Sequence, residues 1–290
     1  MTNSIAARRR RRWLSSLAAG LRLLVHSNLF ISLAAASVVI TTVVLAGFPL
    51  DPVPFFIVFA VTLFVYTVNR FTDLEEDEEN VPQRAAFIKR YGRYWLAIGA
   101  GLYLATVGAA VALSLPGAGF LLIPPVVAVV YSLGGIKRVF LVKNLFVGLA
   151  WGLIPLGVGI YYGRLWTLEI QFLAAYVAAM ITIAAVIFDI KDIVGDRAEG
   201  IPTVPTRYGP RRTRIVTQAA NLLAAAIVVG LVTVGALPET FLTLFAFHGY
   251  VGCYIPFASR SRGPLFYGFV VDGEHVFLAG VVLALEWLVW

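Results

Sequence analysis

Apolar stretches recur along the whole chain, and the short segments between them collect most of the charged side chains. An α-helix of about 20 apolar residues is long enough to span the hydrocarbon core of a bilayer. The pattern therefore predicts an all-α integral membrane protein that crosses the membrane several times. Nine transmembrane helices are expected, over residues 27–48, 52–70, 94–114, 116–134, 144–163, 167–188, 214–236, 238–257 and 269–290.

The composition agrees with this pattern. The chain has 290 residues, of which 60% are hydrophobic and 13% are charged, and its mean hydropathy is +0.85. Soluble domains are about 45–50% apolar and about 25% charged, so a soluble globular protein is excluded. A single cysteine, Cys253, also excludes a disulfide framework and a thiolate metal cluster.

The basic residues predict the orientation, because Lys and Arg accumulate in the cytoplasmic loops of membrane proteins. Of 23 basic residues, only Arg164 falls in a loop of the opposite side. We therefore expect a cytoplasmic N-terminus and an external C-terminus. Residues 1–20 would form a basic cytoplasmic segment and residues 21–290 a single transmembrane domain. The net charge of +7 then reflects topology and attraction to lipids, with no nucleic-acid partner.

Ten of the 16 acidic residues fall in two short segments, one after the second predicted helix and one after the sixth. An even number of crossings separates these segments, so both open on the same membrane face. Each contains polar residues spaced so that they line one side of a helix, if that helix continues past the membrane. These are Asn69, Asp73 and Asp77 in the first segment, and Asp189, Asp192 and Asp196 in the second.

Carboxylates stacked on one helical face repel each other, and a divalent cation would remove that repulsion. Oxygen ligands without Cys or a His cluster favour Mg²⁺, which typically uses one or two protein carboxylates together with substrate phosphates. The two sets therefore predict a diphosphate clamp with Mg²⁺ as its cofactor. Two other interpretations stay open. One is a pair of solvated acidic loops, and the other is a cation or metabolite transporter, whose sites lie nearer the bilayer midplane.

Both segments resemble the signatures of the UbiA superfamily of intramembrane prenyltransferases. The first signature, N-D-x-x-D-x-x-x-D followed by N-x-P-x-R, is similar to residues 69–77 and 80–84. The second, D-x-x-D-x-x-x-D, matches residues 189–196. Two positions depart from the family pattern, because Arg70 replaces the usual aspartate and Ala85 replaces a frequent proline.

The resemblance implies transfer of a polyprenyl group from its diphosphate to a lipophilic acceptor within the lipid bilayer, with release of pyrophosphate. We expect two pseudo-repeated halves, helices 1–4 and 5–8, a closing ninth helix, and cytoplasmic active-site loops at 69–93 and 189–212. The implied catalytic and Mg²⁺-binding residues are Asp73, Asp77, Asp189, Asp192 and Asp196. The implied substrate-binding residues are Asn69, Arg84, Tyr131, Lys137, Lys143 and Asn144.

The sequence constrains the identity of the acceptor less than it constrains the transfer reaction. Aromatic or quinone-type acceptors are expected first, because they are common in the family. A glycerol-phosphate lipid of the archaeal type, a carotenoid or a porphyrin are the alternatives. The chain length of the donor and the oligomeric state do not follow from the sequence.

Overall fold

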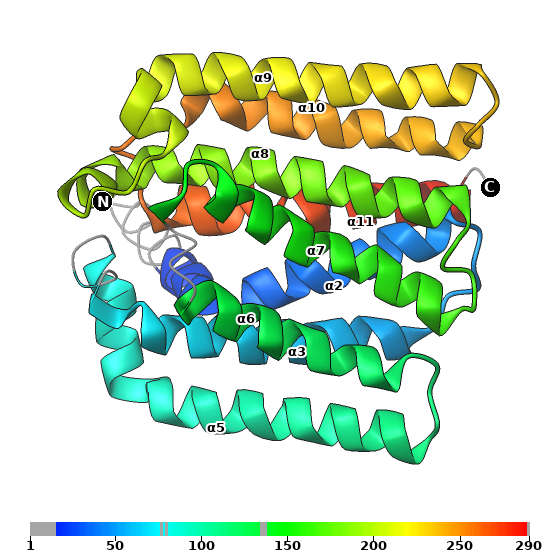
Figure 1. The fold of residues 1–290 in the computed structure, drawn as a ribbon, viewed down its shortest axis with the longest axis horizontal. Coiled ribbons are helices and arrows are strands. Elements are labelled where there is room, and N and C mark those ends of the chain that lie inside the picture. The colour runs from blue at the N-terminus through cyan, green and yellow to red at the C-terminus, as the bar shows by residue number, and fades with distance from the viewer. Residues whose placement is uncertain (1–15, 76–77, 79–80, 134–137, 289–290) are drawn as a thin grey trace, which may run out of the picture.

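A computed structural model describes residues 16–75, 78, 81–133 and 138–288 as a bundle of roughly parallel and antiparallel helices (Figure 1). The described residues contain no strand. The α-helices are α2 (Leu29–Leu45), α3 (Pro52–Thr72), α5 (Pro82–Ala112), α6 (Ile123–Leu133), α7 (Val142–Tyr161), α8 (Leu168–Ala198), α9 (Val204–Thr233), α10 (Leu244–Tyr254) and α11 (Glu274–Leu288). Short 3₁₀ segments are η1 (Ala118–Leu122), η3 (Glu239–Thr243) and η4 (Ile255–Phe257), and η5 (Phe266–Val271) is π-helical.

The helices lie in layers, with α8 in the interior and α5 and α9 on the outside (Figure 1). α8 packs against α7 and α9, while α2 packs against α3 and α11. The largest buried apolar cluster joins α8, α10 and α11, with Phe241, Phe247 and Tyr267 among its fully buried members. α5 and α9 expose large apolar side chains along most of their length, which suits helices that face lipid.

Within the described part of the chain, seven helices are long and apolar enough to cross a membrane, and an eighth span results if Ser16–His26 and Leu29–Leu45 count as one helix bent by 69°. The bend lies at Asn28, whose backbone is left-handed with φ 63°. The span expected at 116–134 is divided into η1 and the short helix α6, with Pro124 in the first turn of α6. Nine spans are thus not confirmed, and the repeat of two halves stays a prediction.

Small residues bring α7 and α8 into close contact. A side chain at Gly148 would collide with the hydroxyl of Thr182 and the carbonyl of Ala178, and a Cβ at Gly152 would lie 2.9 Å from the Ala174 carbonyl oxygen. Glycines at such positions let two membrane helices approach backbone to backbone. This contact places the first turn of α7 directly beside the last turns of α8.

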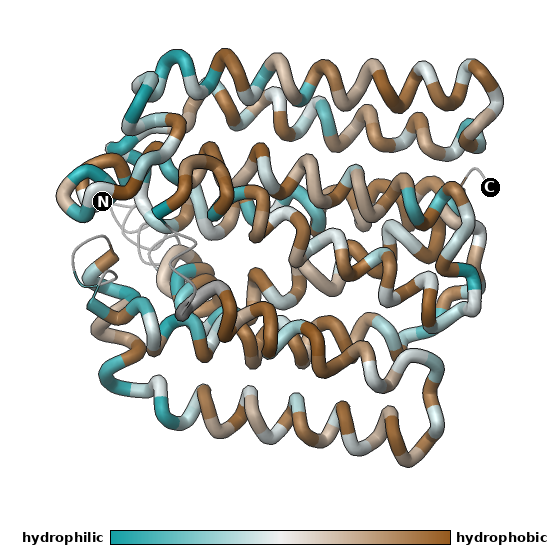
Figure 2. The backbone as a smooth tube through the Cα atoms, in the orientation of Figure 1, coloured by the Kyte–Doolittle hydropathy of each residue, from teal (hydrophilic) through white to brown (hydrophobic). Residues whose placement is uncertain are grey.

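Hydrophilic residues collect at one end of the bundle, where the chain passes from α3 to α5, from α8 to α9 and from α10 to η5 (Figures 1 and 2). The turns from α2 to α3 and from α7 to α8 lie at the other end (Figure 1). The prediction that both acidic segments open on the same side is therefore confirmed for the described residues.

Candidate active site

A cavity of about 530 Å³ runs through the middle of the bundle between α2, α3, α6, α7 and α8. Its wall is charged at the hydrophilic end and apolar over most of its remaining depth. The predicted site residues that line the charged end are Asn69, Asp73, Arg84, Lys143, Asn144, Asp189 and Asp192. The fold therefore brings residues from the two sequence motifs, more than 100 positions apart, to one space.

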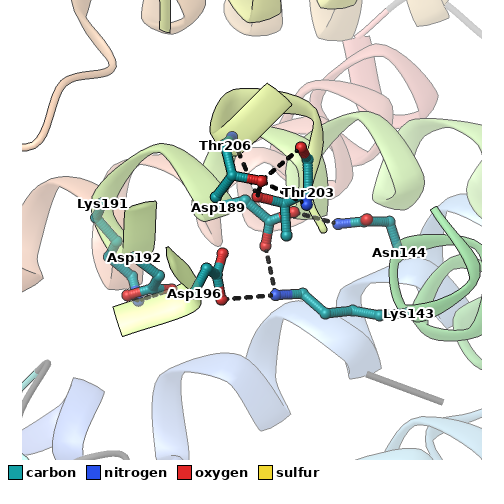
Figure 3. Close-up of polar contacts among 8 residues, drawn as sticks. All are labelled: Lys143, Asn144, Asp189, Lys191, Asp192, Asp196, Thr203 and Thr206. Atoms are coloured by element: carbon teal, nitrogen blue, oxygen red, sulfur yellow. Dashed lines mark hydrogen bonds and ion pairs between the residues drawn. The ribbon is translucent and has the colours of Figure 1, made fainter. Parts of the chain in front are cut away.

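Asp189 is the most enclosed carboxylate of the cavity, with only 3% of its surface exposed. Lys143 Nζ lies 2.8 Å from its Oδ1, and Asn144 Nδ2 donates a hydrogen bond of 2.9 Å to its Oδ2 (Figure 3). Both partners belong to the first turn of α7. A buried carboxylate is costly unless it is paired and hydrogen-bonded, so these two contacts stabilise the charged form of Asp189.

Lys143 lies between two carboxylates of α8 (Figure 3). Its Nζ is also 3.6 Å from Oδ1 of Asp196, which lies about two turns further along α8. The second oxygen of Asp196, Oδ2, is buried and has no hydrogen-bond partner among the described residues. The two carboxylates thus place their negative charge around the ammonium group of Lys143, while Asp196 itself is not part of the cavity wall.

Asp192, which lies between Asp189 and Asp196 in the sequence, lines the cavity wall. Lys191 Nζ contacts both of its oxygens, at 3.0 and 2.9 Å (Figure 3). The same ammonium group lies 5.6 Å from the centre of the Phe188 ring. All three predicted aspartates of the second set therefore belong to α8, as expected for a helix that continues beyond the apolar run, and each has a lysine near it.

The end of α8 is defined by a left-handed glycine. Gly200 has φ +69°, and the amide of Ile201 donates a hydrogen bond of 2.7 Å to the Asp196 carbonyl. This is the geometry in which glycine ends a helix and satisfies its last carbonyls. Thr203 and Thr206 then form a capping box at the start of α9. Much of the expected loop at 189–212 is consequently helical, and its bend lies at residues 199–203.

The first motif has a different geometry from the one expected. α3 ends at Thr72, and Asp73 is its C-cap, with φ −102° and ψ 16°. The shared helical face of Asn69, Asp73 and Asp77 was expected only if this helix continued past the membrane, and at Asp73 that condition is not met, because this residue leaves helical geometry. Asp73 still lines the cavity, together with Asn69, whose Oδ1 is buried without a hydrogen-bond partner among the described residues. Asp77 lies outside the described residues.

The remaining predicted contacts are only partly described. Arg84, in the first turn of α5, lines the charged end of the cavity. Lys137 lies outside the described residues, and the side chain of Tyr131 does as well. The structure places further charged groups in the wall that the sequence did not single out for this site: Arg70, Lys191, Arg260, Arg262 and Asp272. The basic ones are typical cytoplasmic-loop residues, so their sequence positions carry no signal of a binding role.

Asp272 enters the site through an unusual local structure. It directly follows the π-helical turn η5, and its amide donates a hydrogen bond of 3.1 Å to the Tyr267 carbonyl. Single π-helical turns are frequent at functional sites, because the extra residue rotates the following side chain. The carboxylate of Asp272 experiences the positive charges of Arg70, Lys191 and Arg84. A third chain segment thus contributes a carboxylate to the same charged end.

The donor set fits a hard divalent cation. The cavity wall offers carboxylate oxygens from Asp73, Asp189 and Asp192, and Oδ1 of Asn69, which has no hydrogen-bond partner among the described residues, adds one more acceptor. Among the described residues, no three His, Cys, Asp or Glu side chains are already grouped to hold a metal ion. Mg²⁺ does not need such a cage, because it is usually bound through one or two carboxylates and substrate phosphates.

Comparisons with known proteins give a consistent picture. Residues 30–265 match the UbiA prenyltransferase family. A digeranylgeranylglyceryl phosphate synthase from Methanothermobacter thermautotrophicus is 30% identical over 176 residues, which cover 58% of this chain and 59% of that protein. The aligned region therefore spans about three-fifths of that relative's length.

Solved structures share the fold. The apo structure of a UbiA homolog from Aeropyrum pernix K1 aligns with a TM-score of 0.60 and 19% identity, over 87% of this chain and 95% of that one. A structure described for digeranylgeranylglyceryl phosphate synthase aligns with a TM-score of 0.56 and 17% identity, over 90% of this chain and 94% of that one. At such identities the likeness establishes the fold alone.

Proposed function

The chain belongs to the UbiA prenyltransferase family, and from this premise we propose that it transfers a polyprenyl group from a polyprenyl diphosphate to a lipophilic acceptor in the membrane. Family membership confirms the predicted enzyme class, a prenyltransferase. The observation that carries the proposal is the central cavity, which joins a charged end to a long apolar interior. A prenyl diphosphate has the same two-part chemistry.

The charged residues have separate tasks in this reaction. Breaking the allylic carbon–oxygen bond produces a delocalised cation and a highly charged pyrophosphate, so the site must hold the leaving group and exclude water. Arg84 and Lys191 lie where they can bind phosphate oxygens. Mg²⁺, when bound, would neutralise charge on the leaving group. Asp73, Asp189 and Asp192 would hold it, and Asp77 and Asp196 complete the proposed set.

The acceptor that fits best carries a phosphate group. Among the described residues, six basic side chains line the charged end: Arg70, Arg84, Lys143, Lys191, Arg260 and Arg262. So many cations in one wall favour a second anion beside the diphosphate. A relative named digeranylgeranylglyceryl phosphate synthase supports the same choice. We therefore place the glycerol-phosphate lipid first, while the aromatic or quinone-type acceptor stays an untested prediction.

A pyrophosphate-release assay tests this proposal. We expect purified protein in detergent to release pyrophosphate from geranylgeranyl diphosphate only when both Mg²⁺ and a glycerol-phosphate monoether lipid are present, with chelation by EDTA reversing the activity. The control acceptor is a lipophilic phenol without phosphate. Activity with the phenol but not with the glycerol-phosphate lipid would contradict the proposed acceptor class. Folded protein that releases pyrophosphate with no acceptor offered would contradict the transferase itself.

Asp272 provides a second prediction. Asp272→Asn should lower kcat/KM about 10-fold, because Arg70, Lys191 and Arg84 lose the carboxylate charge that holds them in place beside the diphosphate, an effect of roughly 1.4 kcal/mol. Steady-state kinetics at several Mg²⁺ concentrations would measure it. The matched control is Glu286→Gln, at an exposed position near the other end of α11. Equal kinetics in the Asp272 variant and the wild type would remove this residue from the site.

The apolar helices and the family together identify a multi-pass integral membrane protein. We further propose that the charged end of the bundle faces the cytoplasm, with the N-terminus on the same side and the C-terminus outside. The basic clusters support this orientation, since the turn from α7 to α8, which holds Arg164, lies at the opposite end of the bundle (Figure 1).

A further inference from the structure

A short loop at the hydrophilic end of the bundle connects η4 to η5 and contributes two arginines to the central cavity (Figure 1). Arg260 and Arg262 both line the charged end of this cavity, although more than 60 positions separate them from the second aspartate motif. Both side chains are exposed, so they stand where the cavity opens to solvent.

Hydrogen bonds from neighbouring elements hold the backbone of this loop. The guanidinium of Arg214, on α9, donates through Nη1 to the Ala258 carbonyl at 2.8 Å. The Tyr267 hydroxyl donates to the Ser259 carbonyl at 2.9 Å, and the Arg262 amide donates to the same carbonyl at 3.2 Å. Ala258 and Tyr267 are almost fully buried. The two arginines therefore project from a turn that is anchored to the core of the bundle.

Neither arginine has an acidic partner among the described residues. The side chain of Arg260 forms no hydrogen bond, ion pair or ring contact with any of them. Arg262 donates from Nε to the Phe257 carbonyl at 3.2 Å, and its guanidinium lies 5.4 Å from the centre of the Phe266 ring. The lysines of the same wall differ, since each already contacts an aspartate of α8. The arginine pair can therefore bind an anion without giving up a carboxylate.

The loop stands beside the second aspartate set. The Lys191 ammonium lies 6.0 Å from the centre of the Tyr267 ring and contacts both oxygens of Asp192. Tyr267, in turn, experiences the charges of Asp192 and Arg262. The arginine pair is thus a neighbour of the carboxylates that face the donor's diphosphate in the proposed function.

We propose that Arg260 and Arg262 bind the phosphate group of the acceptor, while Lys191 and Mg²⁺ serve the diphosphate of the donor. The inference rests on the proposed function, since it divides the charged end of the same site between two substrates. In a glycerol-phosphate monoether, the free hydroxyl is on the carbon next to the one that carries the phosphate. A phosphate held at this loop brings that hydroxyl toward the allylic carbon beside the diphosphate. Arginine suits this task, because its planar group binds phosphate oxygens through two parallel hydrogen bonds.

Equilibrium binding, followed by calorimetry, tests this role without a transfer step. We expect purified protein in detergent to bind a glycerol-phosphate monoether lipid about 100-fold more tightly than the same lipid without phosphate, because each charged hydrogen-bonded contact contributes about 10-fold. Arg260→Gln should reduce this preference about 10-fold, and the double variant with Arg262→Gln should remove it. Equal affinity of the wild type for both lipids, or a preference that survives in the folded double variant, would overturn the proposal.

Steady-state kinetics separates the acceptor from the donor. Arg260→Gln should raise KM for the phosphate acceptor about 10-fold and leave KM for geranylgeranyl diphosphate, and inhibition by magnesium pyrophosphate, within about twofold of the wild type. Arg90→Gln is the matched control, since it removes an equal charge from an exposed position near the start of α5, outside the cavity wall. Both KM values should stay unchanged in this control. An equal loss for donor and acceptor in Arg260→Gln would assign the arginine to the leaving group and contradict the inference.

Binding and turnover together distinguish this inference from the proposed function. Binding that depends on the phosphate and on both arginines, without transfer from any donor, would contradict the proposed function and still support the phosphate subsite. Transfer to the phosphate acceptor that proceeds with the same KM in the double variant would support the enzyme activity and overturn the subsite.

Discussion

Asp189→Asn is expected to reduce turnover by about 10³-fold, the upper range for loss of a single preorganised electrostatic contact in an active site. The asparagine keeps the shape of the side chain but removes the charge that Lys143 and Asn144 hold in place at 2.8 and 2.9 Å. The fold should survive, since Lys143 retains Asp196 as a partner. The measurement is single-turnover transfer with saturating Mg²⁺ and acceptor, and the same loss is expected for Asp73→Ala and Asp192→Ala.

The matched control for this prediction lies on the same helix segment. Glu199 is an exposed carboxylate at the C-cap of α8, so Glu199→Gln removes an equal charge outside the cavity. Its activity should stay within about twofold of the wild type, because exposed charges interact weakly through water. Turnover retained in Asp189→Asn, Asp73→Ala and Asp192→Ala alike would mean that the carboxylates serve another purpose.

The largest effect on stability is expected at Gly148. Leucine at this position would collide with Ala178 and Thr182 of α8, and overpacking of a close contact costs about 3 kcal/mol or more. A loss of this size lowers the melting temperature by about 10 °C in a domain of 150–250 residues. Thermal unfolding in detergent, followed by tryptophan fluorescence, measures the shift.

Gly101→Leu separates this effect from the general cost of changing a helical glycine. Gly101 lies on α5, and a Cβ there meets no atom within 4 Å. This control should therefore unfold within a few degrees of the wild-type protein. Equal melting temperatures for Gly148→Leu and the control would show that α7 and α8 can separate without loss of stability.

Much of the site was accessible from sequence because its residues follow local periodicity. Asp189, Asp192 and Asp196 share one continuous helix, so their spacing predicted a common location. Asp73 does not share a continuous helix with Asn69 in this way, because α3 ends before it. Nothing in the residue types distinguishes a helix that continues from one that ends there, although Asp73 still lines the cavity.

Other features of the site had little local signal. The family resemblance implied that Lys143 binds substrate, but its position between two aspartates arises only when α7 packs against α8. Asp272 sits near the start of the last predicted helix, where helix capping was the simpler interpretation. Its place in the cavity depends on the π-helical turn before it, which hydropathy does not reveal.

Hydropathy and motif spacing were sufficient to identify a helical membrane protein, a shared face for both aspartate segments and the family to which the chain belongs, since each of these depends on residues close together in sequence. The bend at Asn28, the division of the span at 116–134, the contact of Gly148 with α8 and the apolar depth of the central cavity all arise from packing between distant segments. Such contacts depend on the shapes and volumes of side chains from different helices, and the hydropathy pattern of a single helix does not determine them.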